Sequence, residues 1–528
     1  MLSKVQSATL QGLQAMPINI EVDVTKSNDN NKPRFVIVGL PDSAVKESQE
    51  RVMSAVRNMG INAEHRAIVV NLAPADVRKE GSGFDLPIAV GLLKALDDNA
   101  LPDLGEARYM FAGELGLDGN ILPIRGALPI AILARSLQYE ALFVPVDNAR
   151  EAAVVDRLKV YGVEHLSEVI NILKGQSLVQ PTEVNTRAEF YAQQNEYAFD
   201  FADVKGQENV KRAFEVAAAG GHNIILIGSP GCGKSMMAKR LPSILPPLSL
   251  EESLETTQIQ SIAGKLTRES TLVSQRPFRT PHHTISDVAL VGGGNTFMPG
   301  EICLAHNGVL FLDELPEFNR TVLETLRQPL EDRIITISRS KYTYTLPCSF
   351  QLVASMNPCP CGYYNHPTHP CVCTPGQRQR YMNRISGPLL NRIDIQVEVE
   401  SVPFEDMSRA PKGEPSAAIR ERVIKARQIQ AERFSSLPKQ GGLGRVHCNA
   451  QMTSALLQQF AQLDEQSVTI LRSAMHKFDL SARAYDRILK VARTIADLEG
   501  SEQIRSYHIA EAVGYRNLDR GNWAEMGV

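Results

Sequence analysis

The sequence lacks the features that mark several large protein classes. None of its apolar runs approaches the roughly 18 residues that span a bilayer, and its N-terminus has no apolar core of the length that a secretory signal needs. Charge is nearly balanced, with 56 Lys and Arg against 59 Asp and Glu, and 43% of the residues are hydrophobic. This composition excludes disordered and low-complexity classes. We therefore expect a cytoplasmic globular protein with no membrane partner, in which any contact with nucleic acid is local.

Cysteine is also sparse, with eight in 528 residues. A secreted domain built on disulfides is short and rich in cysteine, so that class is excluded. Four of the eight fall within fifteen residues, between positions 359 and 373. This distribution indicates a reducing compartment, and the four clustered cysteines are candidate metal ligands.

The length predicts about three domains, at roughly 100–200 residues each. The first has α/β character, because short β-type runs (Ile18–Val24, Phe35–Val38, Ala67–Leu72) alternate with helical spacing over Ala44–Met59. The expected organisation is an α/β domain at 1–172, a polar linker at 173–200, a second α/β domain at 201–400, a proline-containing linker at 401–416, and a mildly basic all-helical part at 417–528.

A phosphate-binding loop opens the second domain. An apolar strand from Asn223 runs into G-x-x-x-x-G-K-S, and a helix is expected over Met236–Leu245. Glycines let the backbone turn tightly so that its N–H groups face phosphate oxygens, while the lysine supplies a positive charge and the serine hydroxyl suits Mg²⁺. The residues predicted to bind ATP are Gly228, Ser229, Pro230, Gly231, Cys232, Gly233, Lys234 and Ser235.

Two later strands end in polar residues that complete a hydrolytic site. The apolar run 308–312 ends in Asp313 and Glu314, which fits a Walker B element. Asp313 is expected to hold Mg²⁺ with Ser235, and Glu314 to polarise the attacking water. The run 350–356 ends in Asn357, which we interpret as a sensor that orients this water.

Arginines are the candidates for transition-state contacts. Arg392 follows a short apolar turn and is predicted to reach a neighbouring subunit's nucleotide, with Arg384 as the alternative. In the helical part, Arg483 is the first candidate to reach back to the phosphates, and Arg487 is the second.

The cysteine cluster pairs two C-x-C hooks, and its four thiolates suit tetrahedral Zn²⁺. The predicted ligands are Cys359, Cys361, Cys371 and Cys373, in an insert at 358–375 between Asn357 and Arg392, with His366 and His369 as spare ligands. Four thiolates leave no open position, so the zinc is expected to be structural. The alternative is a loop of reduced thiols.

Two segments are candidates for DNA contact. Alternating β runs at 334–346 flank a Ser-Arg-Ser-Lys turn, which predicts a hairpin whose tip carries Arg339, Lys341 and Tyr342. These cations could contact phosphates without reading bases, although an ordinary exposed hairpin carries similar charges. The second candidate is Thr280–Phe297, with glycines at 292–294. Its histidines, His282 and His283, are as consistent with packing as with DNA contact.

The order of these motifs resembles the AAA+ superfamily over about 201–515. The segments 276–284 (RPFRTPHHT), 299–302 (PGEI) and 305–308 (AHNG) are similar to the magnesium-chelatase-like branch, and the N-terminal block with the cysteine cluster resembles the ComM/YifB family over the whole length. This resemblance implies a homo-hexamer that uses ATP and Mg²⁺ to drive branch migration of DNA during natural transformation, acting on double-stranded, branched or single-stranded DNA with recombination proteins as further partners. Similarity to helicases with a hairpin before the sensor strand implies that the hairpin at 334–346 faces a pore.

The N-terminal domain resembles the proteolytic domain of Lon, of the ribosomal S5 domain 2-like fold, at 77–89 and 111–126. Lon-type proteolysis needs a serine activated by a lysine. In this chain the serine position carries Asp85 and the lysine position carries Leu128, while Ser82 lies nearby without a partner lysine. We therefore predict a proteolytically inactive domain that faces DNA or assembles the ring. Arg78 and Lys79 are interpreted as solvated surface, with phosphate contact as the alternative.

Three other functions remain as alternatives to the DNA motor. One is a chelatase-type remodeller of a protein partner, and another is a Lon-like ATP-dependent protease, which Asp85 and Leu128 disfavour. The third is a passive nucleotide-binding scaffold, in which Glu314 and Arg392 would have no chemical role.

Overall fold

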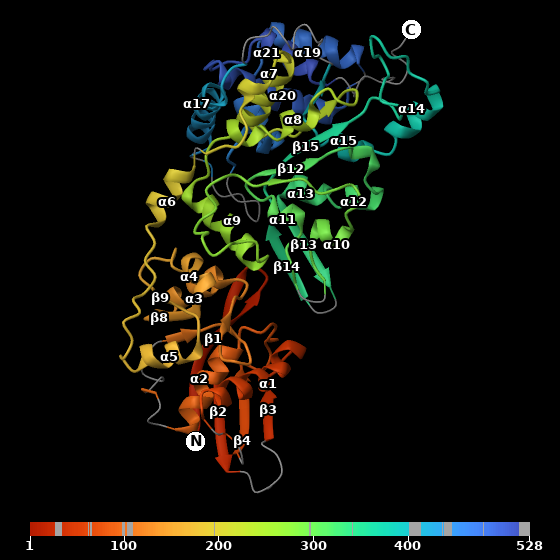
Figure 1. Cartoon of the computed structure of the whole chain (residues 1–528). Coiled ribbons are helices and arrows are strands. Elements are labelled where there is room, and N and C mark those ends of the chain that lie inside the picture. The colour runs from red at the N-terminus through yellow and green to blue at the C-terminus, as the bar shows by residue number, and fades with distance from the viewer. Residues whose placement is uncertain are drawn as a thin grey trace. The chain divides into compact units, whose positions relative to one another are not determined.

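The structure is a computed structural model of the whole chain, shown in Figure 1. It describes residues 1–26, 34–61, 63, 66–97, 101–102, 109–194, 196–294, 297–339, 342–400, 413–435, 437, 446–478 and 480–516. The chain divides into two units. The first comprises 1–194, 249–274 and 295–299, and the second comprises 195–248, 275–294 and 300–528.

A mixed sheet forms the centre of the first unit. Among its described residues, seven strands pair in the order β3-β4-β2-β1-β5-β8-β9. The pairs β1/β2 and β2/β4 are antiparallel and the others are parallel. The strands are β1 (Leu2–Gln11), β2 (Gln14–Lys26), β3 (Arg34–Val38), β4 (Arg66–Ala73), β5 (Tyr109–Phe111), β8 (Ala141–Pro145) and β9 (Lys159–Val163), and β6 (Glu114–Leu115) pairs separately with β7 (Ile121–Leu122).

Sequence periodicity explains how this sheet is covered. In β2, alternate residues from Ile18 to Val24 are buried, as expected for a strand with one face on a core. Helix α1 (Ser43–Asn58) starts where the Asp42 carboxylate accepts a hydrogen bond from the Val45 N–H at 2.8 Å, and it buries a stripe at helical spacing. The other helices that follow it along the chain are α2 (Asp85–Leu96), α3 (Ala127–Ser136), α4 (Val146–Ala152) and α5 (Leu166–Leu173).

Two helices of the first unit lie where the sequence predicted other roles. Helix α6 (Thr186–Gln193) lies inside 173–200, which was expected to be a linker without periodic structure. Helix α9 (Leu250–Ile262) follows the P-loop in the chain but belongs to the first unit. There the Ser261 hydroxyl donates to the Glu151 carboxylate at 2.7 Å, and the Gly126 N–H donates to the Ser261 carbonyl at 3.1 Å.

A parallel sheet forms the centre of the second unit (Figure 1). Within its described residues the strand order is β11-β12-β15-β10-β16, and every neighbouring pair is parallel. Strands β10, β12 and β15 are buried along their whole length, as parallel strands covered on both faces are. The strands are β10 (Ile224–Ile227), β11 (Phe278–Arg279), β12 (Val309–Leu312), β15 (Gln351–Met356) and β16 (Ile395–Glu398).

The helix that follows the P-loop is shorter than the sequence predicted. Instead of Met236–Leu245, α8 covers Lys234–Ala238, and a 3-10 turn follows at Leu241–Ile244. Pro242 explains the break, because proline lacks the N–H that a continuing helix needs and its ring clashes with the preceding turn.

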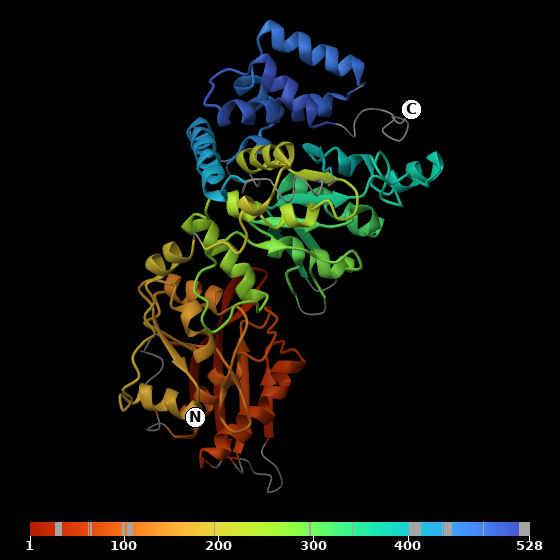
Figure 2. The ribbon, with the colours of Figure 1, turned by 45° about the horizontal axis from the view of Figure 1, so that its top comes forward.

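Helices cover the remaining surfaces of the second unit. Figure 2 shows the C-terminal helices together in blue, and α17 and α20 pack against α7. Residues of the sheet and of these helices form one continuous apolar core. The helices are α7 (Glu208–Gly220), α10 (Asp287–Val291), α11 (Glu301–Leu304), α12 (Arg320–Glu324), α13 (Arg327–Asp332), α14 (Pro375–Met382), α15 (Gly387–Leu390), α17 (Ser416–Phe434), α18 (Ser454–Phe460), α19 (Glu465–Lys477), α20 (Ala482–Leu498) and α21 (Ser506–Gly514).

The expected hairpin is present, with β13 (Ile334–Arg339) antiparallel to β14 (Tyr342–Pro347). Among the helices that the structure describes, none combines the length and the apolar character needed to cross a bilayer.

Candidate nucleotide site and cysteine cluster

The P-loop leaves the sheet at the carboxyl end of β10, between β15 and β16. Ligands of open parallel sheets bind at this edge. Gly231 and Gly233 have φ values of +80° and +92°, which only glycine adopts without strain. The sequence therefore folds the loop as its glycine spacing predicts.

Lys234 lies inside this loop and is largely buried. Its ammonium group donates to the carbonyls of Gly228 at 2.7 Å and Ser229 at 2.9 Å, and to the side-chain oxygen of Asn357 at 3.2 Å. Lys234 and Asn357 are 123 positions apart in the chain, so the adjacent strands β10 and β15 bring the predicted sensor to the P-loop lysine.

Oxygen donors for Mg²⁺ meet beside this lysine. The Ser235 hydroxyl donates to one oxygen of the Asp313 carboxylate at 2.7 Å, and the buried Ser355 hydroxyl donates to the other. A hydroxyl next to a carboxylate suits a hard cation, so these residues fit Mg²⁺. Sequence reasoning missed Ser355, although a serine in the apolar run of β15 was a usable signal.

Glu314 has an unusual backbone. Its φ is +55°, in the left-handed region that residues other than glycine rarely adopt, and its N–H donates to the Ser355 hydroxyl at 3.2 Å. Such conformations cluster at functional sites. The carboxylate is about half exposed, and its Oε2 lies 3.8 Å from Nδ1 of the His283 imidazole. His283 was expected only as a packing or DNA-contacting residue, and its position beside Glu314 is a new finding.

Tyr381, on α14, also borders the site and was not predicted. Burial raises the pKa of its phenol to about 12, and the phenol hydrogen-bonds the backbone of Asn357. It therefore stays protonated at neutral pH and holds the segment that carries the sensor.

The two candidate finger arginines differ in exposure. Arg392 is about nine-tenths buried, and its guanidinium pairs with Glu331 and donates to the Pro388 carbonyl at 2.6 Å. Arg384 is about half exposed and pairs with Glu317 at 2.8 Å. In this chain taken alone, Arg384 has the freer guanidinium.

The two candidates on α20 differ in the same way. Arg483 is exposed on the first turn of the helix. Arg487 pairs with Asp394, which is almost fully buried and also accepts from the His222 imidazole at 3.1 Å. Although burial acts in the opposite direction, Arg487 and His222 hold the pKa of Asp394 well below its usual value. Arg483 is thus exposed and could contact a nucleotide, whereas Arg487 is paired with a buried carboxylate.

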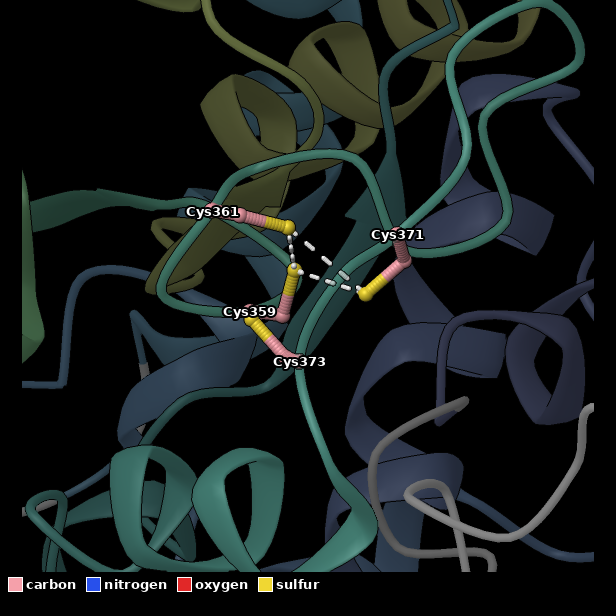
Figure 3. A group of neighbouring side chains, drawn as sticks. All are labelled: Cys359, Cys361, Cys371 and Cys373. Carbon is pink, nitrogen blue, oxygen red and sulfur yellow. Dashed lines mark hydrogen bonds between the residues drawn. The ribbon is translucent and has the colours of Figure 1, made fainter.

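The four clustered cysteines come together as predicted (Figure 3). Their sulfur atoms all lie within 4.8 Å of one another. The Cys359 sulfur lies 3.3 Å from that of Cys361 and 3.7 Å from that of Cys371, and the last two are 3.6 Å apart. Zn–S bonds of about 2.3 Å place tetrahedral sulfurs about 3.8 Å apart, so the four thiols fit zinc. The histidines His366 and His369 are not in this group.

The hairpin brings together the two segments predicted to contact DNA. A Cβ at Gly293 would lie 3.1 Å from Nε of Arg339, and the Tyr342 hydroxyl donates to the Gly294 carbonyl at 2.9 Å. The Tyr342 ring also stacks on Tyr344, with centroids 5.1 Å apart. Arg339 is exposed, whereas Lys341 lies outside the described residues.

In the first unit, the positions expected for a proteolytic dyad form structural contacts. The Asp85 carboxylate is buried and accepts from the Arg51 guanidinium at 2.6 and 3.1 Å. Leu128 is buried, and its N–H donates to the Glu151 carboxylate at 3.0 Å. The Ser82 hydroxyl donates to Glu114. These groups therefore form structural contacts, and no serine–lysine pair is found at these positions among the described residues.

One expectation for this unit was wrong. Lys79 was interpreted as solvated surface, but it is fully buried and its ammonium donates to the Pro74 carbonyl. Burial lowers its pKa. Arg78 is partly exposed and pairs with Glu80 at 3.0 Å.

Comparisons with known families identify the class of protein. The family described as "Magnesium chelatase, subunit ChlI" matches residues 200–407, and its C-terminal part, "Magnesium chelatase, subunit ChlI C-terminal", matches 413–516. "Subunit ChlI of Mg-chelatase" matches residues 20–148. Together with the P-loop and the Asp-Glu strand end, these matches define a magnesium-chelatase-like AAA+ protein.

Relatives of similar length define the family. The chain is 44% identical over 522 residues to "Competence protein ComM" of Haemophilus influenzae, covering 98% of each chain. It is 42% identical over 525 residues to the uncharacterized protein YifB of Escherichia coli, again covering 98% of each. A magnesium-chelatase subunit ChlI of Chlorella vulgaris is 25% identical over 204 residues, 33% of this chain and 56% of that protein. The chain belongs to the ComM/YifB family.

Proposed function

We propose that the protein is an ATP-driven DNA translocase of helicase type that works as a homo-hexamer and promotes branch migration when incoming DNA recombines during natural transformation. The observation that carries the ATPase part is the gathering of Lys234, Ser235, Asp313, Glu314 and Asn357 at one edge of the parallel sheet. The name of the Haemophilus relative links the family to competence, in which DNA is taken up.

In this proposal the P-loop and Lys234 bind the phosphates of ATP, and Ser235 with Asp313 holds Mg²⁺. When bound, Mg²⁺ neutralises charge that develops on the phosphates. Glu314 takes the proton of the attacking water, and Asn357 orients that water. Arg483 of the same chain and Arg392 of a neighbouring subunit, with Arg384 as the alternative, stabilise the transition-state charge.

The hairpin β13–β14 supplies the proposed DNA contact. Its tip carries the exposed Arg339 and, in sequence, Lys341, with Tyr342 beside them. Cations repeated around a ring would grip the phosphate backbone without reading base sequence.

The cysteine cluster is proposed to hold a structural zinc. Its ligands are Cys359, Cys361, Cys371 and Cys373, whose sulfur spacing fits a closed tetrahedral site. Zinc content of the purified chain, measured against a Cys371→Ser plus Cys373→Ser variant, tests this directly. One zinc per chain that the variant loses supports the site, and an unchanged content contradicts it.

The proposed DNA motor and the chelatase-like alternative respond differently to DNA. A remodeller of a protein partner is favoured by the family matches to magnesium chelatase. Steady-state ATP hydrolysis should rise several-fold when single-stranded or branched DNA is added to a translocase and should stay constant in a remodeller. Lon-like proteolysis has little support, because the position of the serine nucleophile carries Asp85, whose carboxylate pairs with Arg51.

A further inference from the structure

The insert that carries the cysteines returns to the phosphate-binding loop. Strands β10 and β15 are adjacent and parallel, so the P-loop and the segment after Met356 leave the sheet side by side. The Gly228 N–H donates to the Met356 carbonyl at 3.2 Å, and Lys234 reaches Asn357. Two hydrogen bonds therefore already join the loop to this segment.

A third contact comes from the cysteine turn itself. A Cβ at Gly362 would lie 2.6 Å from Cδ and 2.8 Å from Cγ of Pro230, at the centre of the P-loop. The φ of Gly362 is +85°, and its N–H donates to the Cys359 carbonyl at 3.0 Å. Glycine is thus required both by the backbone and by the close approach of the Pro230 ring.

We propose that the metal-bound cysteine turn positions the P-loop, and that Gly362 is the positioning residue, through its contact with Pro230. Gly362 is separated from Cys361 by a single peptide bond and is hydrogen-bonded to Cys359, so two metal ligands fix its place. Zinc then does more than stabilise an insert, because its occupancy sets the shape of the loop that binds ATP. The proposal rests on the ATP and zinc sites proposed above.

The contact is tested with a double-mutant cycle in the full-length chain. Gly362→Ala should weaken the binding of a fluorescent ATP analogue, and raise KM for ATP, by about tenfold, a typical cost of an overpacked contact. Zinc content should remain unchanged, and kcat should change by less than about twofold. Pro230→Ala removes both Cγ and Cδ, the two ring atoms that a Cβ at Gly362 would meet, so adding Gly362→Ala to it should change KM by less than about twofold. An equal loss in both backgrounds, or no loss in either, would overturn the contact as a route to the P-loop.

Two glycines serve as matched controls. A Cβ at Gly376 in α14, or at Gly500 with φ +70°, would meet nothing within 4 Å. Gly376→Ala tests an added Cβ directly after the insert without the contact, and Gly500→Ala tests the backbone strain without it. Both should leave KM for ATP near the wild-type value, and a rise as large as that of Gly362→Ala would contradict the proposal.

Removal of the metal provides a second test that needs no Gly362 variant. Stripping zinc from the wild-type chain with a chelator should weaken ATP binding, and adding zinc back should restore it, while the same treatment of Pro230→Ala should have little effect. A wild-type chain that holds zinc but binds ATP equally well without it overturns the role of the metal. A chain that holds no zinc refutes the proposed zinc site instead, and one that binds no ATP refutes the proposed ATPase.

Discussion

Glu314 combines a left-handed backbone with a half-exposed carboxylate at the end of β12. Its neighbour Asp313 is held by two hydroxyls, so the pair divides into one fixed carboxylate and one that is free to act on water. This division matches the metal-binding and base roles proposed for them.

Glu314→Gln should therefore slow ATP hydrolysis by about 10²–10⁴-fold, the usual contribution of a general base, while ATP still binds. Lys234→Ala should weaken binding itself, because the phosphates would then have no lysine ammonium to pair with. Binding of a fluorescent ATP analogue and the hydrolysis rate separate the two effects. Glu421→Gln, on the exposed face of α17, is the control, and a Glu314→Gln chain with normal turnover would remove the base assignment.

The two arginines of α20, Arg483 and Arg487, are also expected to have different roles. Arg483→Ala should reduce ATP turnover with little change in the free energy of unfolding, since Arg483 is exposed. Arg487→Ala should lower that free energy by about 3 kcal/mol, because it leaves the buried Asp394 carboxylate without its main cation. Denaturant unfolding and ATPase assays on both variants check this. If Arg487→Ala is as stable as the wild-type chain, the structural role of the ion pair is wrong.

Contacts between distant residues mark the limit of what the sequence predicts at this scale. The P-loop residues, Asp313, Glu314 and Asn357 follow strand ends, so motif spacing located them. Tyr381 and the Arg51–Asp85 pair depend on which elements become neighbours, and no local pattern records that. Lys79 was misplaced for the same reason, since a lysine in a polar stretch carries no sign of its burial.

At the scale of elements, hydrophobic patterns predicted β2, β3 and β4 of the first sheet, β10, β12 and β15 of the second, α1 and the hairpin at 334–346. It failed where local chemistry interrupts a pattern, as at Pro242, which ends the helix after the P-loop. It also gave no sign that α9, which follows the P-loop in sequence, belongs to the first unit. The partner of an amphipathic helix is a property of the tertiary fold.

The hairpin β13–β14 is the element on which the proposed DNA contact depends. Arg339→Ala with Lys341→Ala should weaken binding to a single-stranded oligonucleotide and reduce the slope of log affinity against log salt by about one for each phosphate that the variant no longer neutralises. Lys425→Ala, which removes one exposed cation from α17, is the control. Binding titrations at several salt concentrations provide the measurement, and an unchanged slope would exclude the hairpin as the element that binds phosphate.

At the scale of the whole molecule, a finger arginine from a neighbouring subunit requires that two subunits share each ATP site. Glu314→Gln and Arg392→Ala chains should each be inactive alone, and mixing them should restore part of the ATP turnover. In the mixed ring, an intact Glu314 of one subunit meets an intact Arg392 of its neighbour. If Arg384 is the finger instead, Arg384→Ala will complement Glu314→Gln and Arg392→Ala will fail to do so. A lack of recovery with both arginine variants would refute a shared site.

The most direct test of the central claim is branch migration on synthetic three-way and four-way DNA junctions by the purified chain. With ATP and Mg²⁺, the chain should resolve the junctions into the expected duplex products, and omission of ATP or the Glu314→Gln variant should abolish this activity. An active ATPase that leaves both junctions unchanged, and whose hydrolysis rate is the same with and without DNA, would contradict the account.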